Sequence, residues 1–384
     1  MEKLMKDVAK KIVWSMNMKR GESLRISAGL HEQELVEEMI ILAMKQGIDV
    51  TTALGSDNLS KRVYSEVPTE KLRKTSKLSM KIVEALNNHV AIERLKDPRV
   101  AESFPPKKIA AVRESAEPVS KLIEKYNIKT CFVGYPTEEM AEKLGVKFSL
   151  LKKFILNGML IKHNDLTKKA DFIRNCLKGA KYAHAYDEYG TDLKILVKGR
   201  RPLLDDGLIG DEDIKNKDLH GNLPCGEIFL APVETYAEGI LVSPKRADSF
   251  TGKMIENITL VFENGKLNIK KTKAEKNEKA LKTTLKSCIN IDKKMHKVVR
   301  TTNIAELGIG LNPVIDQIIG YLLTDEKIGG TIHVALGENK RFPGGKSESC
   351  LHWDFITNKG VNLEAIYQSG KKKMILDKGK PCFS

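Results

Sequence analysis

Long apolar runs are missing from this 384-residue sequence. Its most apolar stretches, 39–44 and 131–135, are far shorter than the roughly 20 residues that a transmembrane helix needs. The opening residues MEKLMKDVAKKIV also lack the apolar core and the small-residue cleavage site of a signal peptide. We therefore expect a cytoplasmic protein that does not contact a membrane.

Cysteines are few and widely spaced. None of the six forms a C-x-x-C pair, which excludes a zinc knuckle and a thioredoxin-like motif. Free thiols are the usual state of such cysteines in the cytoplasm. The phosphate-binding patterns G-x-G-x-x-G and the P-loop are also missing, so the sequence offers no support for nucleotide binding.

Aromatic residues make up only 6% of the sequence, although the chain is strongly basic, with a net charge of +15. A basic surface suits phosphate contacts with nucleic acid. However, the aromatic residues do not alternate with the basic runs, and no nucleic-acid-binding motif is present. We expect no nucleic-acid partner, and a basic RNA-binding protein is the more remote alternative.

The order of the predicted elements favours an α/β fold. A chain of this length is expected to form two or three domains. In the first half, segments with helical spacing alternate with short β-branched runs, which is typical of a layered domain with a mainly parallel sheet. Helices are expected at 8–17, 32–46, 77–86, 107–125, 138–144, 149–157 and 165–177, and strands at 23–27, 48–54 and 130–134.

The character of the sequence changes near residue 183. Strands are expected at 191–197 and 238–242, a helix at 276–288, and hairpins around 263–265 and 369–370. We therefore predict an N-terminal α/β domain at 1–185 and a strand-rich, mixed α+β domain at 186–384.

Four segments of the second half place polar side chains with metal-binding groups among apolar residues. These segments are 222–232, 305–313, 325–337 and 349–355. Glu227 and Glu306 lie within apolar runs, where an ionised carboxylate is costly to bury unless it is paired or binds a metal.

The other candidate ligands show strand spacing. His333 shares one face of an alternating stretch with the small residues Thr331 and Ala335. His352 and Asp354 are two residues apart and therefore point to the same side of a strand. Imidazole and carboxylate groups suit Zn²⁺, Co²⁺ or Mn²⁺, and this number of ligands favours a site for two metal ions.

Each of these residues alone has a more ordinary interpretation. A glutamate in an apolar run most often pairs with an arginine or lysine. A histidine on a strand is more often a hydrogen-bonded core residue than a ligand. His220, beside the first segment, is a weaker candidate for a residue that contacts a metal ligand without binding the metal itself.

Taken together, the four segments resemble the aminopeptidase T and aminopeptidase S group of metallopeptidases. The motifs that carry the resemblance follow the order typical of that group and read Gly226-Glu-Ile-Phe-Leu-Ala-Pro232, Glu306-Leu-Gly-Ile-Gly-Leu-Asn-Pro313, Gly330-Thr-Ile-His-Val-Ala-Leu-Gly337 and His352-Trp-Asp354. The resemblance implies a metal-binding C-terminal domain, two divalent metal ions (Zn, Co or Mn), peptide substrates and a homodimer that encloses the site.

The resemblance also assigns roles to residues. It implies metal ligands at Glu227, Glu306, His333, His352 and Asp354. We expect an aminopeptidase in which a water bridging the metals attacks the peptide bond and Glu306 carries its proton to the leaving amine. Glu326 is expected to contribute as a ligand or as a base.

One feature departs from the group. Its members carry a tyrosine after the third motif, thought to stabilise the transition state, whereas this sequence has Phe342 and no tyrosine in that stretch. Lys340 or Arg341 is a candidate for supplying positive charge there, and a tyrosine from elsewhere in the chain is the alternative. The departure keeps a second hypothesis open, another metal-dependent amidohydrolase on the same scaffold.

Overall fold

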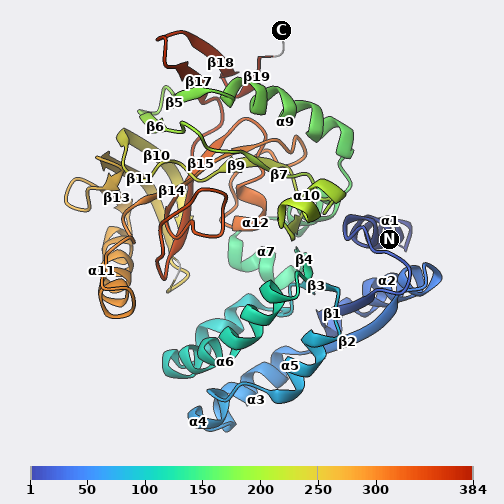
Figure 1. Cartoon of the computed structure of the whole chain (residues 1–384). Helices are drawn as coiled ribbons and strands as arrows, with labels where there is room; N and C mark the ends of the chain where they lie inside the picture. The colour runs from blue at the N-terminus through green and yellow to red at the C-terminus, as the bar shows by residue number, and fades with distance from the viewer. Residues whose placement is uncertain (1, 249, 383–384) are drawn as a thin grey trace. The chain divides into compact units, whose positions relative to one another are not determined.

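The computed structural model describes residues 2–248 and 250–382, and Figure 1 traces the chain. The chain forms two compact units. The first consists of the residues up to Leu160 together with Gly207–Cys225. The second consists of Ile161–Asp206 together with the residues from Gly226 onward.

A parallel sheet forms the centre of the first unit. Its order is β2-β1-β3-β4-β8, and all neighbouring strands are parallel. The strands are β1 (Ser23–Gly29), β2 (Asp49–Gly55), β3 (Asn88–Ile92), β4 (Lys129–Val133) and β8 (His220–Leu223). Because the chain extends the sheet in both directions from β1, the arrangement is a doubly wound α/β layer.

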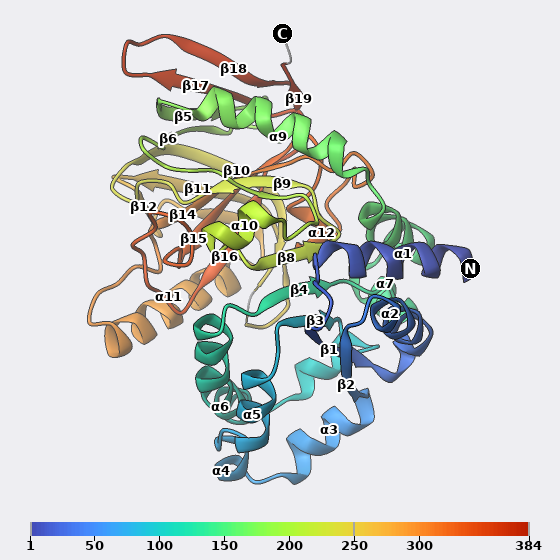
Figure 2. The same ribbon diagram turned by 45° about the vertical axis from the view of Figure 1, so that its right-hand side comes forward.

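Helices cover both faces of this sheet, with α1 and α2 on one face and α5 and α6 on the other (Figure 2). Leu35, Val36 and Met39 recur at helical spacing along α2 and are buried, which explains why this segment forms a helix against the sheet. The helices of this unit are α1 (Glu2–Ser15), η1 (Leu30–Glu32), α2 (Gln33–Lys45), α3 (Asp57–Glu66), α4 (Thr69–Leu72), α5 (Lys77–Glu84), η2 (Pro98–Ser103), α6 (Pro106–Lys125), α7 (Glu138–Leu144), α8 (Phe148–Lys152), η3 (Lys153–Asn157) and α10 (Asp211–Asn216).

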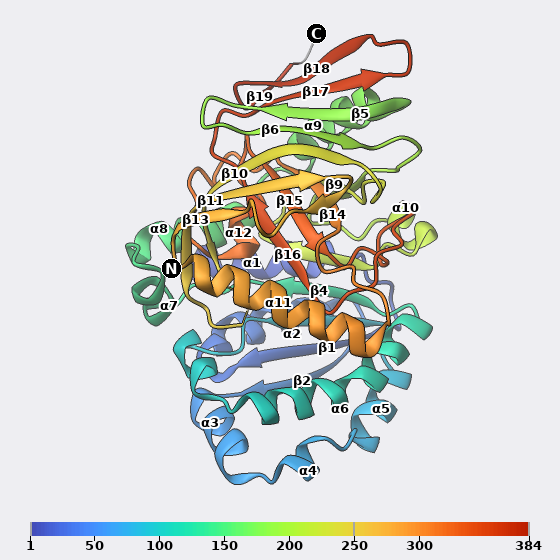
Figure 3. The same cartoon turned by 90° about the vertical axis from the view of Figure 1, so that its left-hand side faces the viewer.

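Two antiparallel sheets form most of the second unit. In the larger sheet, β18, β17, β5, β6, β10 and β11 follow one another in space (Figure 3). Its strands are β5 (Ala180–Tyr186), β6 (Asp192–Leu196), β10 (Ala237–Ala247), β11 (Met254–Glu263), β12 (Lys266–Leu267), β13 (Lys273–Lys276), β17 (Asn362–Tyr367), β18 (Lys372–Asp377) and β19 (Lys380–Pro381). The helices of this unit are α9 (His163–Leu177), α11 (Glu278–Met295) and α12 (Leu322–Asp325).

The smaller sheet has the order β16-β15-β14-β9-β7 and is antiparallel throughout. Its strands are β7 (Leu203–Asp205), β9 (Glu227–Leu230), β14 (Ile304–Gly310), β15 (Ile332–Gly337) and β16 (His352–Ile356). Every residue of β14 and β15 is buried. One face of these strands carries large apolar residues such as Leu307, Val334 and Phe355. Because side chains alternate along a strand, the opposite face carries the candidate metal ligands.

The predicted α/β class is confirmed, and most of the predicted helices and strands form within a few residues of their expected bounds. The central strand β3 was not expected, because Asn88 and His89 interrupt its apolar pattern. Asn88 is nevertheless fully buried, since its amide donates to Glu22 Oε2 (2.9 Å) and to the Ser23 carbonyl (3.0 Å).

The division of the chain into units differs from the single boundary expected between residues 185 and 186, because each unit contains two segments of the chain. The chain enters the second unit at Ile161 and returns to the first for Gly207–Cys225. The return occurs because β8 pairs with β4 and completes the parallel sheet. Such a long-range pairing leaves no local signal in the sequence. None of the described helices is both long and apolar enough to cross a membrane.

Candidate metal centre

The five expected ligands lie on neighbouring strands of the smaller sheet. Glu227 begins β9, Glu306 lies on β14, His333 on β15, and His352 and Asp354 on β16. Strand pairing brings these residues close together. Ala335 pairs with both Glu306 and Asp354, and His333, two residues before Ala335, pairs with Gly308. Strand alternation then turns all five side chains toward the same face of the sheet.

Small residues on this face make room for the ligands. A Cβ atom at Gly308 would lie 1.9 Å from Nε2 of His333, so the imidazole occupies the space that any larger residue would fill. Ala335 likewise separates Glu306 from Asp354 without filling the space above the sheet. Small residues are therefore required beside the candidate ligands, because larger side chains would overlap them.

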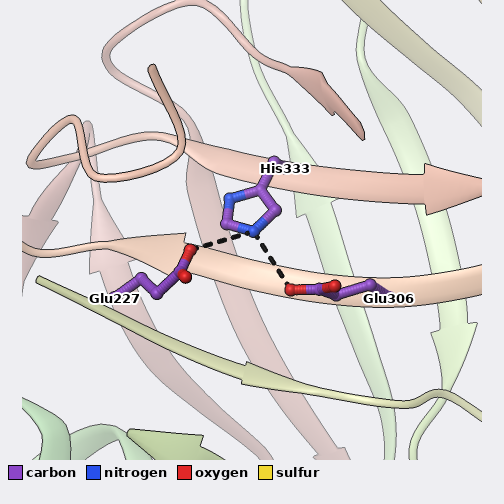
Figure 4. A group of neighbouring side chains, drawn as sticks. All are labelled: Glu227, Glu306 and His333. Carbon is purple, nitrogen blue, oxygen red and sulfur yellow. Dashed lines mark hydrogen bonds and ion pairs between the residues drawn. The ribbon is translucent and has the colours of Figure 1, made fainter. Parts of the chain in front are cut away.

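Glu227, Glu306 and His333 form the first group of converging donor atoms (Figure 4). Nε2 of His333 lies 3.3 Å from Oε2 of Glu227 and 3.3 Å from Oε1 of Glu306. All three side chains are buried. The figure shows both carboxylates turned toward the same edge of the imidazole.

His352 and Asp354 form the second group, again with Glu306. Nε2 of His352 lies 3.2 Å from Oε2 of Glu306 and 3.4 Å from Oδ1 of Asp354. The other ring nitrogen, Nδ1, lies 2.7 Å from the Glu338 carbonyl, to which it donates as N–H. Because Nδ1 is committed to that hydrogen bond, Nε2 is the nitrogen that would face a metal ion once it gives up its proton.

Glu306 is the residue that the two groups share. One of its oxygens faces His333 and the other faces His352. A carboxylate with its two oxygens directed at two different ligand sets is the arrangement expected of a bridge between two cations.

Several buried oxygens of the cluster fit a bound cation better than a hydrogen-bond network. Within the described part of the chain, Oε2 of Glu227 and both carboxylate oxygens of Asp354 have no hydrogen-bond donor in good geometry. Buried carboxylates without donors are unfavourable unless a cation compensates them. The nitrogen and oxygen donors match the preferences of Zn²⁺, Mn²⁺ or Co²⁺.

The mutual contacts shift the pKa values of the cluster. Burial alone would lower the pKa of His333, but its hydrogen bond to Glu306 and the charge of Glu227 raise it to about 9. Burial raises the pKa of Glu227. Burial would also raise the pKa of Glu306, but hydrogen bonds from His333 and His352 hold it below its usual range.

Glu326 and Lys327 lie beside the first group. Lys327 is fully buried, and its Nζ forms a short hydrogen bond to Oε1 of Glu227. The same Nζ lies 3.4 Å from Oε2 of Glu326 and 3.5 Å from Oδ2 of Asp205. Glu227 thus has the lysine partner that the more ordinary interpretation expects, and it faces His333 as well.

Lys327, Asp205 and Arg246 contact the cluster but were not expected from the sequence. Lys327 directly follows Glu326 in the sequence, and its burial among carboxylates leaves no periodic signal there. Asp205 reaches the cluster because β7 pairs with β9, opposite Glu227. Arg246 lies on β10 and donates from Nε to the Asp354 carbonyl (2.8 Å), which fixes the backbone of that candidate ligand.

Two other candidates have different surroundings. His220 belongs to the first unit, where its Nδ1 lies 2.5 Å from the Thr130 hydroxyl. Phe342 packs edge-on against His352, with ring centroids 5.8 Å apart, and also contacts Phe229. An aromatic ring thus flanks the candidate ligand, and it has no hydroxyl group.

Curated relatives of known name match almost the full length of the chain. Aminopeptidase AmpS of Bacillus subtilis is 24% identical over 96% of this chain and 95% of its own length. Aminopeptidase T of Thermus aquaticus is 23% identical over 95% of both chains. These identities are low, but the alignments leave no large segment of either protein unmatched.

Solved structures share the fold. AmpT from Thermus thermophilus superimposes with a TM-score of 0.76, at 18% identity, over 98% of this chain and 99% of that one. A 2,5-dihydroxypyridine dioxygenase from Pseudomonas putida superimposes with a TM-score of 0.60, at 14% identity, over 98% and 97%. The fold therefore also occurs in a protein named for a different reaction.

The family comparison agrees with the ordered motifs and with the two groups of converging donors. Residues 1–380 match the model of a family described as thermophilic metalloprotease (M29). Because that match covers nearly the entire sequence, the chain belongs to the thermophilic metalloprotease (M29) family.

Proposed function

We propose that this metal-dependent peptidase removes the N-terminal residue of short peptides, using two divalent cations held by the cluster. The proposed ligands are Glu227, Glu306, His333, His352 and Asp354. The observation that carries the proposal is the position of Glu306, whose two oxygens face two different imidazoles. The aminopeptidase names of two full-length relatives support the same activity.

The ligand atoms divide between two positions. Glu227 and His333 would hold one cation, His352 and Asp354 the other, and Glu306 would contact both. When bound, such cations supply Lewis acidity to the attacking water and to the scissile carbonyl. The hydrogen bond from His352 Nδ1 to the Glu338 carbonyl keeps that imidazole in the orientation required of a ligand.

Glu326 is the better placed of the two carboxylates expected to carry a proton. Both oxygens of Glu306 are engaged by the imidazoles, whereas Glu326 belongs to neither ligand group. Its side chain is 15% exposed, and it lies next to Lys327 at the border of the cluster. We infer that Glu326 accepts the proton of the attacking water and delivers it to the leaving amine.

The acidic surroundings favour a substrate with a free amino terminus. Glu227, Glu326 and Asp205 lie around Lys327, so that three carboxylates face a single ammonium group beside the cluster. A protonated α-amino group is attracted to carboxylates, and its binding there would place the first peptide bond at the site. This charge pattern supports removal of one terminal residue over cleavage within a chain.

The activity is tested with aminoacyl-p-nitroanilides and metal-loaded protein. We expect release of p-nitroaniline that stops on chelation and returns when Zn²⁺, Co²⁺ or Mn²⁺ is added. The N-acetylated forms of the same substrates serve as matched controls and should not be cleaved. Release that persists after chelation contradicts a metal-dependent mechanism.

A second candidate function is another metal-dependent amide hydrolysis at the same site. The observation in its favour is Phe342, which lies beside His352 where the resemblance implies a tyrosine. Cleavage of N-acetylated substrates at a rate equal to or above that of the free amines would favour this alternative.

We further infer a homodimer, as the resemblance implies, and a cytoplasmic location, as expected from the sequence. All six cysteines are free thiols, which supports a reducing compartment. Light scattering coupled to size-exclusion chromatography tests the dimer, and a mass equal to that of one chain would contradict it.

A further inference from the structure

Lys327 is fully buried, and its ammonium group is surrounded by carboxylates. Its Nζ bonds Oε1 of Glu227 and lies 3.4 Å from Glu326 and 3.5 Å from Asp205. Burial of an ammonium group is costly, and three carboxylate neighbours compensate that cost. A lysine held in this way has a defined position.

The contact divides the two oxygens of Glu227 between two partners. Oε1 is taken by Lys327, while Oε2 lies 3.3 Å from Nε2 of His333, in the first group of donor atoms. Without Lys327, the carboxylate would be free to rotate and to offer either oxygen or both. The lysine therefore selects which atom of Glu227 faces the cluster.

The backbone around Lys327 ties it to the neighbouring segment. Its N–H donates to the Thr324 carbonyl (3.0 Å), and its own carbonyl accepts from the N–H of Asn312 (2.9 Å). Asn312 follows β14, the strand that carries Glu306. The side chain thus extends from an anchored backbone toward Glu227.

We propose that Lys327 is a positioning residue for one of the two metal positions. It holds Glu227 so that Oε2 alone serves as a ligand there, beside His333. The other position, with His352 and Asp354, has no contact with Lys327 among the contacts of the described residues. This inference rests on the proposed ligand assignment. It predicts that metal affinity depends on Lys327 at the position with Glu227 and His333 but not at the other position.

The test compares metal binding by Lys327→Met, Lys327→Arg and the unchanged chain. Removing the support of a ligand typically weakens metal binding by about 10–100-fold. We expect Lys327→Met to bind one of its two ions about 10–100-fold more weakly, measured by chelator competition with metal analysis of the dialysed protein. Lys327→Arg keeps the charge and should recover part of the affinity.

Two further variants keep the test decisive. Lys276→Met is the matched control, because Lys276 pairs with Glu256 at an exposed site of the same unit and should leave metal binding unchanged. If Lys327→Met does not fold, Lys327→Gln, which retains a hydrogen-bond donor without the charge, should show the same weakening of one position.

A comparison of His352→Ala with Lys327→Met distinguishes failure of this proposal from failure of the ligand assignment. His352→Ala should weaken the other position, and if it keeps both ions bound, the assigned ligands themselves are wrong. If His352→Ala loses an ion while Lys327→Met binds both as tightly as the unchanged chain, or more tightly, then Lys327 does not position Glu227. Tighter binding would mean that its charge acts mainly by repelling the cation.

Discussion

Nε2 of His333 lies where the side chain of residue 308 would otherwise be. A Cβ atom at Gly308 would approach that nitrogen to 1.9 Å, far inside van der Waals contact. The two residues face each other on β14 and β15. The position of the imidazole in the cluster therefore depends on the missing side chain of its partner.

This relationship predicts the effect of Gly308→Ala. The added methyl group must displace the imidazole, so we expect metal affinity to fall by about 10–100-fold, as when a ligand loses its support. Metal analysis after dialysis measures the change. Gly221→Ala is the control, because a Cβ atom there meets Ile209 at an ordinary 3.6 Å. Unchanged metal content in Gly308→Ala would contradict the assignment of His333.

Glu306→Gln tests the bridging role. The amide can offer only one oxygen, whereas the carboxylate directs one oxygen at each imidazole. We expect both cations to bind at least about tenfold more weakly. His352→Ala is expected to weaken one position only. Equal effects of the two substitutions on metal stoichiometry would argue against a bridge at Glu306.

Glu326→Gln tests proton transfer. Because Glu326 belongs to neither ligand group, the variant should keep its bound metal while kcat falls by about 10²–10⁴-fold, the usual contribution of a general base. Steady-state kinetics and metal analysis of the same preparation give both quantities. Glu348→Gln, which removes an exposed carboxylate paired with Lys340, should change neither. Loss of metal from Glu326→Gln would instead make Glu326 a ligand.

Glu32 in the first unit predicts a pH dependence of stability that is independent of the metal cluster. Burial raises the pKa of this carboxyl to about 8, with a further contribution from Glu93, and His31 lies 3.6 Å away. The folded chain keeps this proton up to about pH 8, whereas the unfolded chain loses it near pH 4.5. The contribution of Glu32 to the free energy of unfolding therefore decreases as the pH rises between these values.

Glu32→Gln removes this titration. The amide oxygen can still accept from the Gly29 N–H, which donates to Oε2 in the unchanged chain at 2.7 Å. Relative to the unchanged chain, the melting temperature of the variant should rise by at least about 2 °C between pH 5 and pH 8. Thermal denaturation at the two pH values measures the difference, with the exposed Glu66→Gln as control. A difference that does not grow with pH would mean that Glu32 is ionised in the folded chain.

The residue types and their local spacing were readable from the sequence. Period-two alternation correctly put His352 and Asp354 on the same side of β16, and the apolar surroundings of Glu227 and Glu306 correctly indicated buried carboxylates. These inferences succeed because the direction of a side chain along one strand depends on the local backbone alone.

The contacts between strands were decided by the tertiary structure. Which oxygen of Glu306 faces which imidazole follows from the register of β14, β15 and β16. The contact of Lys327 with Glu227 joins residues 100 positions apart, and β8 returns to a sheet that begins nearly 200 residues earlier. Such pairings depend on the packing of the whole unit, so no local pattern encodes them, whereas the types and local spacing of the candidate ligands are determined by the sequence.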